Sequence, residues 1–293
     1  MPLDQAGYTY CHEHLYIDLS SQKQDEDCKL DQFENIRNEL DFLHSLGVRN
    51  IIEVTNHFMG RNPHFIEDLI KETNINIISS TGFYIEGFFP QSLDAMSSVD
   101  IANVMMEEIN VGIGGSSLKA EVIGEIGSSL NHFSDLEKKV FEGAAIAQRE
   151  TGCPISTHTS LSTMGRQQVE LLAKNRVDLT RVSIGHCDLK DDFDQLLWLL
   201  DQGCKIQFDT IGKNSYYPDE KRIQSIIKLV ERGYINQIML SMDITRRSHL
   251  LANGGKGFSY LMTDFIPKLR QAGLNQKQIE IIMQENPNQF FIK

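Results

Sequence analysis

The feature that most constrains this chain is a regular alternation of short apolar segments with longer segments of helical periodicity. Eight β-branched or apolar runs occupy residues 8–11, 50–54, 75–79, 120–124, 154–157, 182–184, 205–208 and 238–240. Helical periodicity marks the segments 33–47, 63–73, 101–111, 134–152, 164–174, 193–202, 220–232, 260–271 and 276–285. The segment at 134–152 also carries the capping box Ser134-x-x-Glu137 and ends at Gly152. This alternation predicts parallel strands joined by helical crossovers.

Eight such units can close into a barrel, whereas a doubly wound sheet usually stops at five or six strands. A barrel of about 250 residues fits within the 293 residues as one domain. No G-x-G-x-x-G motif opens the first helix and no P-loop is present, so the common nucleotide-binding folds lack their phosphate cradle. We therefore expect an α/β chain with a (β/α)8 TIM barrel as a single domain over residues 1–293.

Charge and hydropathy restrict the partners of this protein. The formal net charge is −12, and nucleic acids or anionic membranes require clustered Lys and Arg instead. No apolar run approaches the roughly 20 residues that span a bilayer, and no secretory signal is visible at the N-terminus. We expect a cytoplasmic protein, monomeric or homodimeric, that acts on a small molecule and binds neither nucleic acid nor membrane.

Two histidines at the end of the first predicted strand are candidate metal ligands. His12 and His14 are two residues apart, a spacing that places both imidazoles on one face of a strand. An isolated H-x-H pair is as often a chance pair as a metal site. The interpretation therefore depends on what the other strand ends carry.

Four further ligand-type residues follow the fourth, fifth, sixth and eighth predicted strands: Glu125, His158, His186 and Asp243. In a barrel these strand ends open on the same mouth, where barrel enzymes carry out their chemistry. Imidazoles with carboxylates suit Zn²⁺, Mn²⁺ or another first-row divalent ion better than Ca²⁺ or Mg²⁺. Six ligands exceed the needs of one tetrahedral zinc, so we expect two divalent ions bridged by Glu125, with Zn²⁺ ranked before Mn²⁺ or another first-row metal.

The motifs CHEHL at 11–15, STHT at 156–159, IGHCD at 184–188 and SMDITRRS at 241–248 resemble the phosphotriesterase family of the amidohydrolase superfamily. The resemblance extends from residue 7 to residue 291. It implies that His12, His14 and Asp243 hold the more buried metal and that His158 and His186 hold the more exposed one. Many family members bridge the metals with a carbamylated lysine, whereas this chain has Glu125, which changes the expected metal spacing and affinity.

The resemblance also implies hydrolysis by a hydroxide that bridges the two ions, with Asp243 accepting the proton. Related barrels hydrolyse phosphotriesters, lactones, esters and amides, and a fold does not determine the substrate. Tyr84 resembles a tyrosine that lines the sites of lactonases in this family, so we rank a lactone or carboxylic ester first. The alternatives are a phosphotriester or organophosphate hydrolase, a metal-dependent isomerase with the same ligands, and a metal-binding protein without catalysis.

The segment after the eighth predicted strand suggests an anionic substrate. Barrels often bind phosphate near their last two strands, and this segment carries Arg246, Arg247 and His249. Lys213, in the preceding loop, is a further candidate for substrate binding. The alternative for either arginine is an ion pair that only supports its loop. We expect a phosphate or carboxylate group on the substrate, received by one of the two arginines.

Overall fold

The computed structural model describes residues 3–292, and its centre is an eight-stranded parallel sheet. The strands follow chain order around the sheet, as β1 (Tyr8–Glu13), β4 (Val48–Glu53), β5 (Asn76–Thr81), β6 (Ala120–Ser128), β7 (Ile155–Thr159), β8 (Val182–Ile184), β9 (Lys205–Phe208) and β10 (Ile238–Leu240). The sheet curls into a nearly closed barrel, so the predicted (β/α)8 fold is confirmed.

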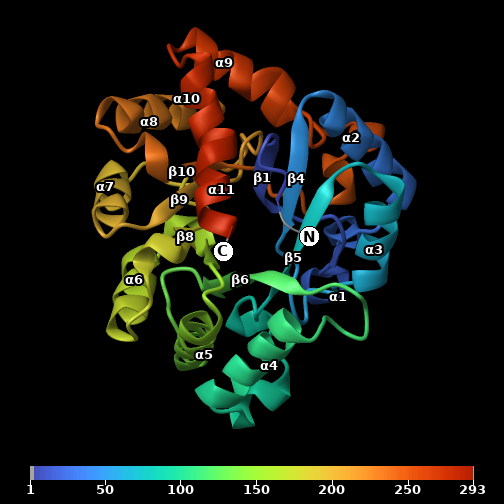
Figure 1. The fold of residues 1–293 in the computed structure, drawn as a ribbon, viewed down its shortest axis with the longest axis vertical. Helices are drawn as coiled ribbons and strands as arrows, with labels where there is room; N and C mark the ends of the chain where they lie inside the picture. The colour runs from blue at the N-terminus through green and yellow to red at the C-terminus, as the bar shows by residue number, and fades with distance from the viewer. Residues whose placement is uncertain (1–2, 293) are drawn as a thin grey trace.

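Helices cover the outside of the barrel (Figure 1). They are α2 (Phe33–Ser45), α3 (Pro63–Glu72), α4 (Ser98–Asn110), α5 (Asp135–Thr151), α6 (Gly165–Lys174), α7 (Phe193–Asp201), α8 (Asp219–Glu231), α9 (Ile266–Gln271), α10 (Gln276–Glu280) and α11 (Asn286–Phe291). Their apolar faces pack on the strands and form the main hydrophobic core. The predicted capping box is present at α5, where Ser134 Oγ accepts from Glu137 N and Glu137 Oε2 accepts from Ser134 N.

Side-chain hydrogen bonds join the first and last strands of the barrel. His12 N donates to Ser241 Oγ at 3.0 Å. The buried carboxylate of Glu13 accepts from Ser241 Oγ and Met242 N with one oxygen and from Ile244 N with the other, at 2.6–3.0 Å. Glu13 therefore anchors the segment that carries Asp243 to the end of β1.

The C-terminal helix α11 lies across one end of the barrel, in front of the strands in Figure 1. Phe290 and Phe291 pack there against inward-facing side chains of several strands, including Ile52, Ile78, Val122 and Met239. Burial of two phenyl rings closes this end with apolar contacts. The polar chemistry of the barrel is left to the opposite end, where the carboxyl ends of the strands meet.

Several element boundaries differ from those predicted. β6 continues to Ser128 instead of ending at residue 124, because its ladder with β7 resumes after an irregularity, with Gly127 opposite His158. α4 begins at Ser98 instead of residue 101, since Ser97 and Asp100 form a second capping box. A short antiparallel pair, β2 (Ile17–Asp18) and β3 (Lys29–Leu30), flanks α1 (Ser20–Lys23) and was not predicted.

The last two predicted helices contain wider turns. Segments of π-helix occupy Leu261–Phe265 and Ile281–Glu285, directly before α9 and α11. Pro267 and Pro287 lie in the first turn of those helices. Proline has no N–H to donate to the carbonyl four residues earlier, so the regular α-helical pattern cannot continue through it. The chain nevertheless stays helical beyond residue 285, where the segment was predicted to end, because the π-helical turn leads directly into α11, which ends at Phe291.

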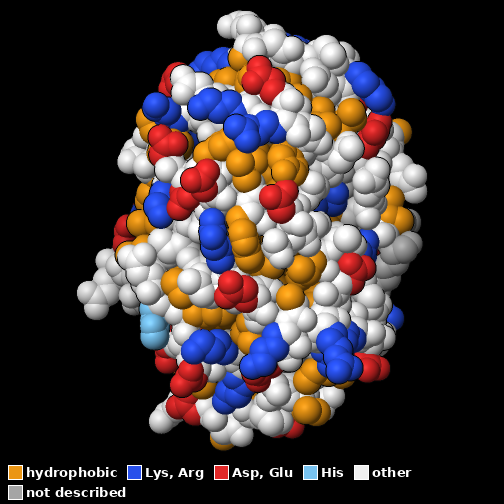
Figure 2. Space-filling view, turned by 90° about the vertical axis from the view of Figure 1, so that its left-hand side faces the viewer, with side chains coloured by type: hydrophobic (Ala, Val, Ile, Leu, Met, Phe, Trp, Pro, Cys, Tyr) orange, Lys and Arg blue, Asp and Glu red, His pale blue; other side chains and the backbone are white. Residues whose placement is uncertain are grey.

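The surface carries charges of both signs. On the face shown in Figure 2, Lys and Arg side chains alternate with Asp and Glu, and apolar side chains lie between them. Within residues 3–292, none of the helices combines the length and the apolar character that crossing a bilayer requires.

Candidate metal centre

The structure brings the six predicted ligand residues together at the carboxyl end of the barrel. His12 lies in β1 with His14 just after it, Glu125 lies in β6 and His158 lies in β7. His186 and Asp243 follow β8 and β10. All six are buried, with exposed fractions between 0% for His12 and 9% for His158. Five strands therefore contribute to one cluster, as the strand-end argument predicted.

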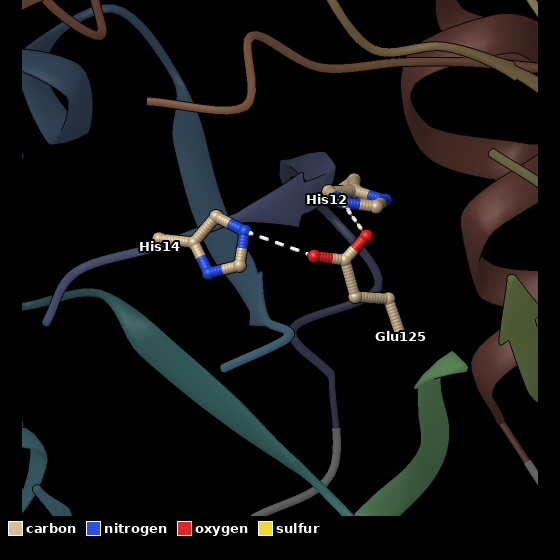
Figure 3. A group of neighbouring side chains, drawn as sticks. All are labelled: His12, His14 and Glu125. Atoms are coloured by element: carbon tan, nitrogen blue, oxygen red, sulfur yellow. Dashed lines mark ion pairs between the residues drawn. The ribbon is translucent and has the colours of Figure 1, made fainter. Parts of the chain in front are cut away.

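Glu125 contacts all four histidines of this cluster. Figure 3 shows its carboxylate between His12 and His14, and its Oε1 lies 3.4 Å from His14 Nε2. Its Oε2 lies 3.3 Å from His12 Nε2, 3.1 Å from His158 Nδ1 and 3.6 Å from His186 Nε2. A carboxylate that faces four imidazoles through both oxygens has the geometry of a bridging ligand.

Asp243 lies on the side of the cluster formed by the first strand. Its Oδ1 is 3.3 Å from His14 Nε2 and 3.9 Å from His12 Nε2. Asp243 thus lies beside His12 and His14, which the resemblance assigns to the same metal, whereas His158 and His186 face Glu125 Oε2 together with His12. The role of each residue as a ligand stays a prediction.

The chemistry of these side chains fits a cation. Within residues 3–292, His12 Nε2 is buried and has no hydrogen-bond partner. Burial alone would lower the pKa of His14, but Asp243 and Glu125 outweigh it and raise this pKa to about 10. Two carboxylates thus favour a positive charge at this position, and a divalent ion would supply it. Ligand atoms lie within 4.8 Å of one another in two sets of three residues. The first set is His12, His14 and Glu125, and the second is Glu125, His158 and His186.

Polar neighbours fix the orientation of the imidazoles. His12 Nδ1 lies 3.0 Å from Gln207 Oε1, and His14 Nδ1 lies 2.7 Å from Thr55 Oγ1. These contacts leave Nε2 of both rings facing Glu125. Such neighbours set the tautomer of metal-binding histidines. Gln207 and Thr55 were not predicted, since their only signal in the sequence is a polar side chain near the carboxyl end of an apolar strand.

Two of the six residues have left-handed backbone conformations. The φ angle is 54° at His186 and 51° at Asp243. Such values are uncommon for residues other than glycine and occur often at functional sites. His186 lies shortly after β8 and Asp243 shortly after β10, in segments that leave the barrel strands.

A cavity of about 490 Å³ opens above the cluster. Four of the predicted substrate-binding residues line it: Tyr84, Lys213, Arg246 and His249. The hydroxyl of Tyr84 is 3.4 Å from His158 Nε2. Burial, together with the nearby Lys213, lowers the pKa of His249 to about 4, so this side chain is uncharged at neutral pH.

The basic residues around the cavity have acidic partners. Lys213 Nζ donates to Asp243 Oδ2. Arg246 pairs with Asp25 at 2.7 Å and with Asp27 at 3.5 Å. Arg247 binds Asp31 through two nitrogens at 2.8 and 3.1 Å, and it is not among the residues that line the cavity. The two neighbouring arginines therefore point to different places.

Comparison with known proteins is consistent with this centre. The family model described as "Phosphotriesterase family" matches residues 2–291. The phosphotriesterase homology protein of Escherichia coli is 54% identical over 99% of this chain and 100% of its own length. An N-acetyltaurine hydrolase of Dictyostelium discoideum is 31% identical over 93% of this chain and 76% of its own length. An aryldialkylphosphatase of Saccharolobus solfataricus is 31% identical over 97% of this chain and 95% of its own length.

Solved structures show the same similarity. The crystal structure of the Escherichia coli protein, complexed with phosphate in its active site, has a TM-score of 0.98, with coverage of 98% of this chain and 99% of that chain. A lactonase from Listeria monocytogenes is 26% identical, with a TM-score of 0.94 and coverage of 99% of this chain and 96% of that chain.

Proposed function

This chain belongs to the phosphotriesterase family of hydrolases, and we propose from this premise that it is a binuclear metal-dependent hydrolase of an anionic lactone or carboxylic ester. The observation that supports the proposal most directly is the position of Glu125. Its oxygens lie 3.1–3.6 Å from nitrogens of all four clustered histidines. A mixed imidazole and carboxylate set favours Zn²⁺ or Mn²⁺ over a metal that prefers only oxygen.

Two divalent ions bound here would supply a nucleophilic hydroxide near neutral pH and would polarise the oxygen of the scissile group. Asp243 would accept the proton of the nucleophile and pass it to the leaving group. Its Oδ1 faces the imidazoles and its Oδ2 accepts a hydrogen bond from Lys213, so the carboxylate is held in one orientation. Tyr84 lies beside His158 in the wall of the cavity, where its hydroxyl can donate to a substrate oxygen.

An anionic group on the substrate is favoured by the charges of the cavity wall. Three cationic side chains line the cavity: Lys23, Lys213 and Arg246. Lys213 and Arg246 have carboxylate partners, whereas Lys23 forms no ion pair with any residue in the range 3–292. The bond between Arg246 and Asp25 is partly exposed, and exposed pairs contribute only about 0–1 kcal/mol. An anionic substrate can therefore take over Arg246 at low cost, with Lys23 as a second positive charge.

The relatives support the same substrate class. The Escherichia coli protein holds phosphate in its active site, and the Listeria relative is a lactonase. The relatives named N-acetyltaurine hydrolase favour a second candidate, hydrolysis of an anionic N-acyl amide. A phosphotriester stays an alternative because of the relative named aryldialkylphosphatase.

A substrate panel on protein reconstituted with Zn²⁺ or Mn²⁺ tests the proposal. It contains lactones and carboxylic esters, phosphorylated sugar lactones, N-acyl amides including N-acetyltaurine, and phosphotriesters, with charged and neutral members matched in pairs. We expect products that have gained one water, with the highest kcat/KM on charged lactones or esters. A product of unchanged mass would identify an isomerase. Absence of turnover across the panel would indicate a metal-binding protein without catalysis.

A further inference from the structure

The strand β9 carries none of the six predicted ligands. Two side chains at its carboxyl end nevertheless contact two of the ligand histidines, His12 and His186. Gln207 lies in β9, and Asp209 directly follows the last residue of the strand. Side chains two positions apart in extended chain point to the same side. Both are completely buried, and both lie under the cluster, beside His12 and His186.

Asp209 contacts both imidazoles. Its Oδ1 lies 2.8 Å from His186 Nδ1, and both of its oxygens accept from His186 N at 3.0 Å. Its Oδ2 lies 3.3 Å from His12 Nδ1. Gly185 permits this approach, since a Cβ there would lie 3.2 Å from Asp209 Oδ2 and 2.1 Å from Thr157 O. The Asp209 carboxylate thus contacts one histidine from each of the two predicted metal positions. His12 belongs to the position with His14 and Asp243, and His186 belongs to the position with His158.

We propose that Asp209 is a positioning residue that couples the two metal positions by holding Nδ1–H on both His12 and His186. With the proton fixed on Nδ1, Nε2 of each ring keeps its lone pair and faces Glu125, from which it lies 3.3 Å in His12 and 3.6 Å in His186. A carboxylate that accepts from the second ring nitrogen fixes both the tautomer and the ring orientation of a ligating histidine. The inference rests on the binuclear centre of the proposed function.

Asp209 also belongs to a set of three, with His12 and His186, whose ligand atoms lie within 4.8 Å of one another. A third metal between them would have to bind where His186 N–H and the two Nδ1 atoms face the carboxylate. The backbone N–H of His186 keeps its proton, and both Asp209 oxygens already accept a hydrogen bond from it. The contacts therefore favour Asp209 as an acceptor for the two imidazoles over a role as ligand.

Gln207 provides a matched control within the same strand. Its Oε1 lies 3.0 Å from His12 Nδ1, while its amide Nε2 donates to Ser156 Oγ at 3.2 Å. Of the two imidazoles next to β9, it supports only that of His12. Removal of Gln207 should thus affect one metal position, whereas removal of the Asp209 charge should affect both.

The test is metal binding by Asp209→Asn and Gln207→Leu, measured by competition of the metal-free proteins with a chromophoric chelator for Zn²⁺. In Asp209→Asn, either orientation of the amide turns an NH₂ group toward an N–H of His12 or His186. We expect both dissociation constants to rise by about 10–100-fold in Asp209→Asn, and only one of them to rise in Gln207→Leu. The circular dichroism spectrum of metal-free Asp209→Asn at the assay temperature should match that of the metal-free wild type, which shows that the variant is folded.

An unchanged dissociation constant at either position in Asp209→Asn would overturn the coupling while the binuclear centre stands. A wild-type limit of one ion per chain would instead overturn the proposed binuclear centre and the coupling with it. The wild-type protein gives an independent check that does not depend on the folding of a variant. Two-bond ¹H–¹⁵N spectra of the zinc-loaded, histidine-labelled protein should show the proton of His12 and His186 on Nδ1, and a proton on Nε2 of either would refute the inference.

Discussion

Replacement of Glu108 by glutamine should destabilise the protein strongly at neutral pH and progressively less as the pH falls below 4.5. Glu108 lies in α4, and its side chain is 8% exposed. Arg61 binds it through two nitrogens, at 2.6 and 2.9 Å, and His57 Nε2 lies 3.0 Å from its Oε1. Burial alone would raise the pKa of Glu108, but His57 and Arg61 outweigh burial and lower it to about 2.

The size of the effect follows from this pKa. The difference between about 2 in the folded protein and the ordinary value of 4.5 corresponds to about 3 kcal/mol, at about 1.4 kcal/mol for each pH unit. Because the folded pKa is the lower one, the charged form stabilises the fold fully above pH 4.5. This contribution decreases as the pH falls from 4.5 and is lost near pH 2, where Glu108 is protonated in the folded protein as well.

Urea unfolding of metal-free wild-type and Glu108→Gln protein, followed by circular dichroism between pH 7 and pH 3, measures this contribution. We expect the free energies of unfolding to differ by about 3 kcal/mol at pH 7 and to converge as the pH decreases. Glu107→Gln is the control, since Glu107 is an exposed neighbour on the same helix, and it should change stability by less than about 0.5 kcal/mol. A difference that is the same at pH 7 and pH 3 would refute the reasoning.

Three further outcomes test the site. Asp243→Asn should retain much of its metal and lose turnover, because the amide oxygen can still act as a weak ligand but cannot accept a proton. Comparison of metal content with kcat tests this, and near-wild-type turnover would contradict the proton transfer. Chelation should lower the melting midpoint and re-addition of metal should restore it, since a ligand at 1,000 times its Kd stabilises by about 4 kcal/mol; a midpoint that does not respond to metal would argue against a metal centre. In Arg246→Met, the loss of kcat/KM for an anionic lactone should exceed the loss for a neutral analogue by a factor that corresponds to about 2–3 kcal/mol. Arg247→Met should change kcat/KM for both substrates equally. Equal losses for both substrates in Arg246→Met would argue against an anion at this residue.

The sequence was sufficient to predict the barrel and to group the six predicted ligand residues at one end of it. Apolar periodicity is a local property, so eight strands and the helices between them could be predicted from short windows of sequence. In a parallel barrel all strands point the same way, so residues that end different strands must meet at one mouth. For this reason His12, His158 and Asp243 could be grouped, although they are far apart in the chain.

Boundaries were less predictable than the elements themselves. The extension of β6 to Ser128 depends on its pairing with β7, and the π-helical turns depend on Pro267 and Pro287. The apolar run ends at Gly124, directly before Glu125, and the strand was predicted to end with it. Pairing with β7 extends the strand beyond this run.

The sequence by itself placed the six predicted ligand residues at the mouth of the barrel, whereas only the tertiary structure decided what each of them faces there. Arg246 and Arg247 are adjacent in the chain, yet one borders the cavity and the other binds Asp31, more than 200 residues away in sequence. The sequence places Asp209 at the end of a strand but does not give its role, because its partners His12 and His186 come from other strands. A strand repeats every two residues and so predicts which side its residues face, but the conformation of a loop and the partner of a charge depend on segments distant in sequence, which no local pattern records.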